Sequence, residues 1–312
     1  MLMPLLTIFT APKPFTNPHI ALIQRNAIQS WIALGAQVRV MVVGSEAGMV
    51  DALADLDVLH LPDVRRNSQG TPFVSSIFDL ARQASDSPLL AYINADILLL
   101  PDCLQAAVQA SQQVDRFLMV GRRWDLAVKE PLDFSAGWDS RLQALLKLNG
   151  RLHAPAGSDY FIFPRQCFTE LPDFAIGRAG WDNWMIYAAR RQGWKVIDAT
   201  QSLTIIHQDH DYSHLPGGKP HYNLPETDEN IRLAGGRRAI FDLRDADRVL
   251  TGGQVRRPVG SWKKFWREVE IAPLVTWHSS FFSQLFFAIF HPVRAFRELR
   301  VELHRLRSKG TV

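Results

Sequence analysis

Cysteine is scarce in this chain of 312 residues, and the scarcity excludes a disulfide-rich secreted framework. Only Cys103 and Cys167 occur, and their spacing is not that of a metal site. We therefore expect two buried free thiols and a reducing compartment, which predicts a cytoplasmic protein.

Long apolar runs and targeting signals are also missing. No uninterrupted apolar stretch approaches the roughly 20 residues that a membrane-spanning helix needs. The first ten residues are apolar but carry no basic leader and no convincing cleavage site, so we interpret them as a strand rather than a signal peptide. Basic residues do not gather into one stripe with a recognised motif, which argues against nucleic-acid binding.

The composition is that of an ordinary globular protein, with 47% hydrophobic and 21% charged residues. A chain of this kind can bury the core of one large domain with an appendage. The net charge of +4 is uneven, because basic residues outnumber acidic ones from Arg256 onward. We predict a catalytic domain at residues 1–255 and a basic, aromatic and amphipathic helical tail at residues 256–312.

Strand-like and helix-like segments alternate through the predicted domain. Short apolar or β-branched runs indicate strands at residues 5–10, 38–43, 58–61, 89–93, 117–121, 158–164, 194–199 and 202–207. Apolar residues at helical spacing indicate helices at residues 18–34, 46–53, 72–84 and 181–192, and from residue 101. The alternation predicts an α/β fold with a mostly parallel sheet flanked by helices. We expect loops at residues 124–157, apart from a helix at 140–148, and an active-site loop at residues 208–237.

The most informative motif is an Asn-any-Asp step, Asn94 and Asp96, directly after the apolar run at residues 89–93. A carboxylate after a buried central strand lies where open α/β sheets bind ligands. Aspartate there is a good ligand for a hard divalent cation, which in turn holds phosphates. The alternative is a simple turn, which Asn and Asp also favour.

Three further segments carry polar residues in comparable places. Residues 157–163 form a strand opened by Gly157, Ser158 and Asp159, and Asp182 stands at the start of a helix. A third apolar run ends in His207, with His210 and His214 close behind.

With these motifs the sequence resembles the glycosyltransferases of the GT-A fold, the nucleotide-diphospho-sugar transferases, over roughly residues 5–210. The resemblance implies that the turn after the first strand holds the nucleotide base, and that the Asn-any-Asp step binds the metal and the donor diphosphate. The matching residues here are Thr10, Ala11 and Pro12 for the base, and Asn94, Ala95 and Asp96 for the diphosphate. It further implies that Asp182 faces the acceptor and that His207 completes a metal site with Asp96 for Mn²⁺ or Mg²⁺.

The chain departs from the family at two points. Asn94 replaces the first aspartate of the usual motif, and Trp181 precedes Asp182 where the family has paired acidic residues. If the transfer inverts the anomeric configuration, a base must take the proton of the acceptor hydroxyl, and Asp182 is the candidate; a retaining transfer needs no enzymic base. Asp159 would orient a sugar hydroxyl or assist that base.

Several candidates have a structural interpretation beside the functional one. Asp182 could merely cap its helix, and His207 could be a hydrogen-bonded residue at a strand end. Arg65 and Arg123 could each bind a phosphate or remain solvated. His210 and His214 could be ordinary loop residues rather than metal ligands. Trp181 and Trp184 could pack in the core rather than stack on a sugar.

The leading hypothesis is a metal-assisted glycosyltransferase. The family implies a UDP-sugar as donor. A glycan or lipid-linked glycan is the expected acceptor, and the basic aromatic tail favours it. A sugar nucleotidyltransferase is the enzyme alternative, but the segment after the first strand, Ala11–Asn17, lacks the glycine and arginine of a phosphate loop. A non-catalytic nucleotide- or glycan-binding module of the same fold is the other alternative, which Asn94 keeps open.

The tail suggests a peripheral contact with a membrane. Residues 261–267 are aromatic and basic, residues 281–290 are strongly apolar, and residues 292–307 place an apolar stripe among arginines. Such a basic amphipathic helix is compatible with the inner surface of the cell membrane. The alternative is a stripe that packs on the catalytic domain or on another subunit.

Overall fold

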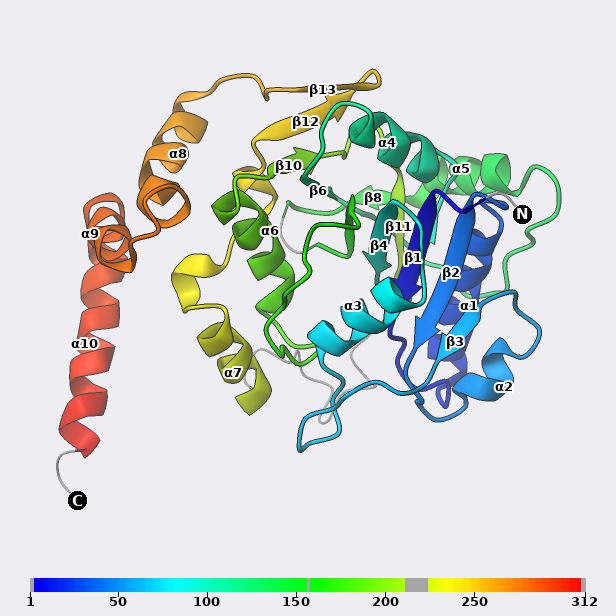
Figure 1. The fold of residues 1–312 in the computed structure, drawn as a ribbon, viewed down its shortest axis with the longest axis horizontal. Helices are drawn as coiled ribbons and strands as arrows, with labels where there is room; N and C mark the ends of the chain where they lie inside the picture. The colour runs from blue at the N-terminus through cyan, green and yellow to red at the C-terminus, as the bar shows by residue number, and fades with distance from the viewer. Residues whose placement is uncertain (1–2, 156–157, 211–223, 310–312) are drawn as a thin grey trace. The chain divides into compact units, whose positions relative to one another are not determined.

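The structure is a computed structural model that describes residues 3–155, 158–210 and 224–309, with only the backbone described for residues 301–309. Among these residues, nine strands form the main sheet. They are β1 (Leu6–Thr10), β2 (Val38–Val43), β3 (Leu59–Leu61), β4 (Leu89–Ile93), β6 (Phe117–Val120), β9 (Tyr160–Pro164), β10 (Lys195–Asp198), β12 (Arg248–Thr251) and β13 (Gln254–Arg256). Their spatial order is β13-β12-β10-β6-β9-β4-β1-β2-β3 (Figure 1).

Most neighbours in this sheet are parallel. The exceptions are β9, which runs antiparallel to β4 and β6, and β13, which forms a hairpin with β12. β1, β4, β6 and β9 are buried along their whole length, as continuous apolar runs require when a sheet is covered on both faces. The predicted α/β class, with a mostly parallel sheet and a C-terminal helical region, is confirmed.

Helices cover both faces of the sheet. They are α1 (Pro18–Ile32), α2 (Met49–Leu53), α3 (Val74–Gln83), α4 (Asp102–Ser111) and α6 (Trp181–Arg191). In the view of Figure 1, α3 lies in front of the sheet against β1 and β2, and α1 lies behind β2.

Local sequence explains why α1 forms and where it packs. Asn17 caps the helix, because its side-chain oxygen accepts hydrogen bonds from the His19 and Ile20 amides. Pro18 follows at the first helical position, where a missing N–H is tolerated. In its last turn lies the fully buried Trp31, whose Nε1 donates to the Ile97 carbonyl at 2.9 Å.

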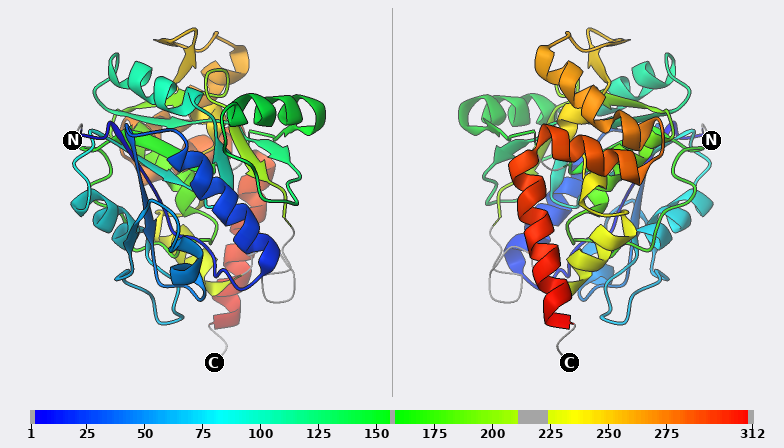
Figure 2. Two further views of the ribbon diagram at one scale, coloured as in Figure 1. Left: turned by 90° about the vertical axis from the view of Figure 1, so that its right-hand side faces the viewer. Right: turned by 90° about the vertical axis from the view of Figure 1, so that its left-hand side faces the viewer.

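A second, smaller sheet lies beside the first and was not predicted. Its strands are β5 (Ile97–Leu99), β7 (Trp124–Leu126), β8 (Arg151–Leu152) and β11 (Ile205–Gln208), in the order β5-β11-β7-β8. The helix α5 (Trp138–Asn149) packs near β7, and Figure 2 shows it in green beside these strands. Buried leucines and Ile206 form a separate apolar cluster under it.

Two predicted loops are therefore wrong in part. Residues 124–157 contain β7, α5 and β8, although the expected helix at 140–148 lies within α5. The expected loop at 208–237 contains the helix α7 (Pro225–Leu233), whose polar sequence has little apolar periodicity to reveal it. Residues 211–223, with His214, and Gly157 lie outside the described residues.

The described chain divides into two compact units, residues 1–189 with 194–258, and residues 190–193 with 259–312. The predicted boundary between residues 255 and 256 stays a prediction. The second unit contains α8 (Trp262–Val275), α9 (Ser280–Phe290) and α10 (Pro292–Lys309). Inside it, Glu268 pairs with Arg190 at 2.6 Å and with Lys264 at 2.9 Å. Among the described residues, no helix has both the length and the apolar character needed to cross a bilayer.

Candidate active site

The Asn-any-Asp step connects the two sheets. Asn94 follows β4, and its amide donates to the Asp159 carbonyl at 2.9 Å. The chain turns there and enters β5, so Asp96 stands between the end of a main-sheet strand and the start of a strand of the second sheet. The Asp96 carbonyl accepts from the Gln208 amide at 3.1 Å, which holds the end of β11 beside it.

Two histidines approach the Asp96 carboxylate. His210 Nε2 lies 3.1 Å from Asp96 Oδ2, and His207 Nε2 lies 3.9 Å from the same oxygen. The other oxygen, Oδ1, is buried and has no hydrogen-bond partner among the described residues. A buried carboxylate oxygen without a partner is costly unless something binds it. Asp96, His207 and His210 thus form a group that could hold a metal ion.

The ionisation of this group suits a divalent cation. Burial alone would raise the pKa of Asp96, but the hydrogen bond from His210 and the positive charges around it hold that pKa well below its usual range. Burial lowers the pKa of His207, which favours its neutral imidazole. Ionised carboxylate and neutral imidazole are the forms that coordinate metals.

A second group, Asp125, His207 and Asp209, also meets the geometry of a metal site. In β7, Asp125 is paired in register with His207 of β11, and its Oδ1 lies 3.5 Å from His207 Nδ1. However, Asp125 already pairs with Arg123 at 3.0 Å and with His153 at 2.8 Å. Because Arg123 and His153 already engage the Asp125 carboxylate, this second group is the weaker candidate for a metal, and His207 Nδ1 itself has no hydrogen-bond partner among the described residues.

Asp159 is held by two donors. Asn94 Nδ2 donates to its Oδ1 at 3.1 Å, and Arg123 Nη1 pairs with its Oδ2 at 2.8 Å. The amide at position 94 therefore has a local reason, because an aspartate there would face the Asp159 carboxylate. Since both oxygens of Asp159 are engaged, it is less free than Asp182 to accept a proton.

Asp182 lies in the first turn of α6. Gly180, with a φ of 111°, turns the chain into the helix, and its amide donates to Asp182 Oδ1 at 3.3 Å. Burial, with a smaller contribution from the nearby Asp159 charge, raises the pKa of Asp182 to about 6, and hydrogen bonds from the Asn183 and Gly180 amides oppose part of that rise. A carboxylate with this pKa is mostly ionised at neutral pH and is well matched to general-base catalysis.

The turn after β1 reaches the candidate metal group of Asp96, His207 and His210. Thr10 is fully buried, and its hydroxyl has no hydrogen-bond partner among the described residues. Ala11 and the buried Pro12 lead to Lys13, whose backbone is held by Gln24 of α1 at 2.7 and 3.0 Å. Lys13 Nζ lies 3.5 Å from His210 Nε2, and burial lowers the pKa of Lys13.

The remaining candidates have partners elsewhere. Arg65 is half-exposed and pairs with Asp173 at 3.1 Å, so no described contact joins it to the site and its phosphate role stays a prediction. Trp181 packs edge-on against Tyr92 in the core at 5.2 Å, and Trp184 packs against Phe174 at 5.1 Å. These tryptophans therefore support the helix.

The sequence analysis missed Asp125, Asp209 and His153, and interpreted His210 as a loop residue at least as readily as a ligand. Asp125 follows two arginines after an apolar strand, which gave a weak signal. The others become visible only when the β7–β11 pairing and the turn after β1 bring them together.

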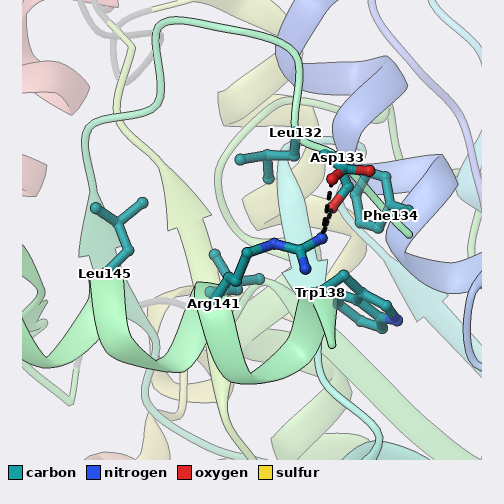
Figure 3. Close-up of a pocket in the computed structure, with 7 residues that line it drawn as sticks. Leu132, Asp133, Phe134, Trp138, Arg141 and Leu145 are labelled. Carbon is teal, nitrogen blue, oxygen red and sulfur yellow. Dashed lines mark hydrogen bonds and ion pairs between the residues drawn. The ribbon is translucent and has the colours of Figure 1, made fainter. Parts of the chain in front are cut away.

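A separate small pocket of about 100 Å³ lies between α5 and the segment before it. Leucines and aromatic side chains line it, and Arg141 turns toward Asp133, to which it donates at 3.1 Å (Figure 3). None of the candidate site residues lines it. Its arginine is already hydrogen-bonded to Asp133, Ser135 and the Ala136 carbonyl.

Solved structures similar to this chain include the mannosyltransferase PcManGT from Pyrobaculum calidifontis in complex with GDP-Man and Mn²⁺, at 16% identity and a TM-score of 0.39. The match covers 66% of this chain and 57% of that one. They also include S. aureus TarS 1-349 in complex with UDP-GlcNAc, at 10% identity and a TM-score of 0.44, covering 73% of this chain and 65% of TarS. The chain thus spans less than two thirds of either protein.

No protein-family model and no curated protein sequence matches the chain. The likeness to the solved structures concerns the fold alone. Which donor, acceptor or metal this chain uses must be argued from its own residues.

Proposed function

We propose that this chain is a glycosyltransferase that moves a sugar from a nucleoside-diphosphate donor to a hydroxyl group of a glycan or lipid-linked glycan. One observation carries the proposal. A largely buried, ionised carboxylate, Asp96, lies within reach of two imidazoles at the end of a central strand. A second carboxylate, Asp182, has a pKa of about 6 and is acted on by the charge of Asp159, which Asn94 hydrogen-bonds. The first arrangement suits a diphosphate-binding cation and the second suits a general base.

Asp96, His207 and His210 would hold Mn²⁺ or Mg²⁺. A cation bound there would neutralise the negative charge of the leaving nucleoside diphosphate. The unpartnered Oδ1 of Asp96 provides a free lone pair for it. The donor is proposed to be a UDP-sugar on the sequence resemblance alone.

Asp182 is proposed to take the proton of the acceptor hydroxyl. As that proton moves to the carboxylate, the acceptor oxygen bonds to the anomeric carbon, and the bond between that carbon and the diphosphate oxygen breaks. Rigid support favours this role, because Met185 and Ile186 of α6 are fully buried. Asp159 and Arg123 would shape the donor side of the site through their ion pair.

The alternative is a module that binds a nucleotide or glycan without transferring a sugar. Asn94 suggested it, but the hydrogen bond from Asn94 to Asp159 gives the amide a local function that is compatible with catalysis. Turnover separates the two proposals, because both expect nucleotide binding.

The first test is thermal stabilisation of the intact chain by a panel of UDP-, GDP- and ADP-sugars, with and without Mn²⁺. A ligand at 100 times its Kd stabilises the folded state by about 2.7 kcal/mol. For a domain of this size that corresponds to a shift of roughly 5 °C. We expect a shift for one nucleotide class that requires Mn²⁺, followed by release of the nucleoside diphosphate when acceptor is added. A panel without any shift contradicts the proposal.

A further inference from the structure

Exposed apolar side chains are concentrated in the second compact unit. Among the residues whose side chains are described, sixteen large hydrophobic residues are exposed, and twelve of them lie between residues 259 and 299. On α9 and α10 they include Phe281, Leu285, Ile289, Val293 and Phe296, with exposed fractions of 47–73%. A soluble protein rarely leaves so much apolar surface uncovered without a binding function.

These residues follow helical spacing. Phe281, Leu285 and Ile289 are four residues apart along α9, which places them on one side of that helix. Val293, Phe296 and Leu299 are three residues apart along α10. Each helix thus presents an apolar stripe that its own unit does not bury.

The charge of the same segment is strongly positive. Residues 256–312 contain eleven Lys and Arg but four Asp and Glu, whereas the other 255 residues contain 24 basic and 27 acidic residues. Two of the four acidic residues are engaged inside the unit, Glu268 with Arg190 and Lys264, and Glu270 with Arg267 and His291. On α10, Arg294, Arg297 and Arg300 are exposed beside the apolar stripe.

Tryptophan adds a third feature. Three of the nine tryptophans, Trp262, Trp266 and Trp277, lie in this unit with 40–72% of their surface exposed. Tryptophan rings favour the boundary between lipid tails and headgroups. Arg300 lies over the Phe296 ring at 4.6 Å, which pairs a cation with an apolar anchor at one place.

We propose that α9 and α10 dock in the plane of an anionic lipid bilayer, with the apolar stripes in the headgroup region and the arginines on acidic lipids. A helix of the length of α9, 11 residues, extends roughly 16 Å, about half of the hydrocarbon thickness, so it lies in the surface. The charge argues against a second copy of the chain as the occupant, because two units of this charge would repel each other. The proposal does not depend on the transferase activity.

The experiment is flotation of the intact chain with vesicles of phosphatidylcholine alone and of phosphatidylcholine with 30% phosphatidylglycerol. We expect binding to the anionic vesicles at low salt and release at high salt, where the charges are screened. Each basic residue near an anionic surface contributes about a factor of five to binding. The triple change Arg294→Gln, Arg297→Gln and Arg300→Gln should therefore weaken binding roughly 100-fold.

Matched controls come from exposed positions in the other unit. The control for the charge change is the triple variant Arg39→Gln, Arg116→Gln and Lys147→Gln, which removes the same number of positive charges. The apolar stripe is tested with Phe281→Ser and Ile289→Ser, and the control for that change is Val50→Ser with Leu148→Ser, which also removes exposed apolar surface. Only the tail variants should lose binding, and melting curves confirm that each variant is folded. Absence of binding at low salt, or equal binding to both vesicles, overturns the proposal. Light scattering tests the alternative. If it shows a stable dimer, and Phe281→Ser with Ile289→Ser dissociates that dimer, the proposal is also overturned, because a second copy then covers this surface.

Discussion

Replacing Asp182 by Asn separates a catalytic base from a helix cap. Asn keeps the shape of the side chain and an oxygen that accepts from the Gly180 amide, but it cannot take a proton. General-base catalysis contributes roughly 100-fold or more, so Asp182→Asn should lower turnover by that factor while Mn²⁺-dependent donor affinity stays the same. A helix cap predicts the opposite, because Asn caps as well as Asp.

The pKa of about 6 gives a pH dependence with a definite sign. A base must be deprotonated, so turnover should be nearly constant above pH 7 and fall about tenfold per pH unit below pH 6. The Asn variant should lose this limb of the profile. A rate profile of the parent enzyme from pH 4.5 to 8.5 measures it.

The folding stability of the parent protein should fall with rising pH, whereas its turnover should rise. Because the folded-state pKa of Asp182 lies above the value in the unfolded chain, the folded state binds the proton more tightly, and stability declines as pH rises from about 4 to 6. Two pKa units correspond to at most about 3 kcal/mol, and less is expected because the side chain retains some solvent contact. Asp182→Asn removes this cost, so its melting temperature at pH 7.5 should equal or exceed that of the parent.

The matched control is Asp139→Asn, which makes the same change in the first turn of α5. It should leave turnover and the pH profile unchanged. Full activity in Asp182→Asn would refute the assignment of Asp182 as the base and would direct attention to Asp159 or to a mechanism without an enzymic base.

Three further predictions concern neighbouring features. His207→Ala should weaken Mn²⁺-dependent nucleotide binding less than loss of a carboxylate does, because a neutral imidazole adds coordination without charge, and calorimetric titration measures the difference. Asn94→Asp replaces the Asn94 Nδ2 donor, 3.1 Å from Asp159 Oδ1, by a second carboxylate, so it should lower the melting temperature more at pH 8 than at pH 4. An equal loss of melting temperature at both pH values would contradict this explanation of Asn94. Trp31→Ala should cost about 3–5 kcal/mol in urea unfolding, since the side chain is fully buried, whereas the exposed Trp262→Ala should cost little.

Seven of the nine strands of the main sheet were predicted, and the central ones, β1, β4, β6 and β9, are buried along their whole length and therefore appear as continuous apolar runs. β12 and β13, which contain polar and exposed residues, were not predicted. β5, β7 and β8 were missed because two or three residues are too few to show a period. The apolar residues after Asp96 belong to a different sheet from those before it, and only tertiary pairing reveals that change. α7 escaped because its sequence is mostly polar.

The site was partly predictable for a related reason. Asp96 and His207 each follow or end an apolar strand, so their positions at sheet edges could be inferred from sequence. Asp125 could be recognised as a site residue only from the strand register that places it opposite His207. His210 could be recognised only from its contact with Asp96. Such information depends on pairing between distant strands, which composition and periodicity do not encode.

The central claim is that Asp96, with two histidines, holds the cation that binds the donor diphosphate. Calorimetric titration of UDP and GDP into the intact chain, with and without Mn²⁺, tests it directly when repeated on Asp96→Ala and on the control Asp102→Asn, whose carboxylate accepts from the Thr204 amide. The account predicts Mn²⁺-dependent binding in the parent and in Asp102→Asn, and its loss in Asp96→Ala with the melting temperature retained. Unchanged affinity in Asp96→Ala would contradict the claim.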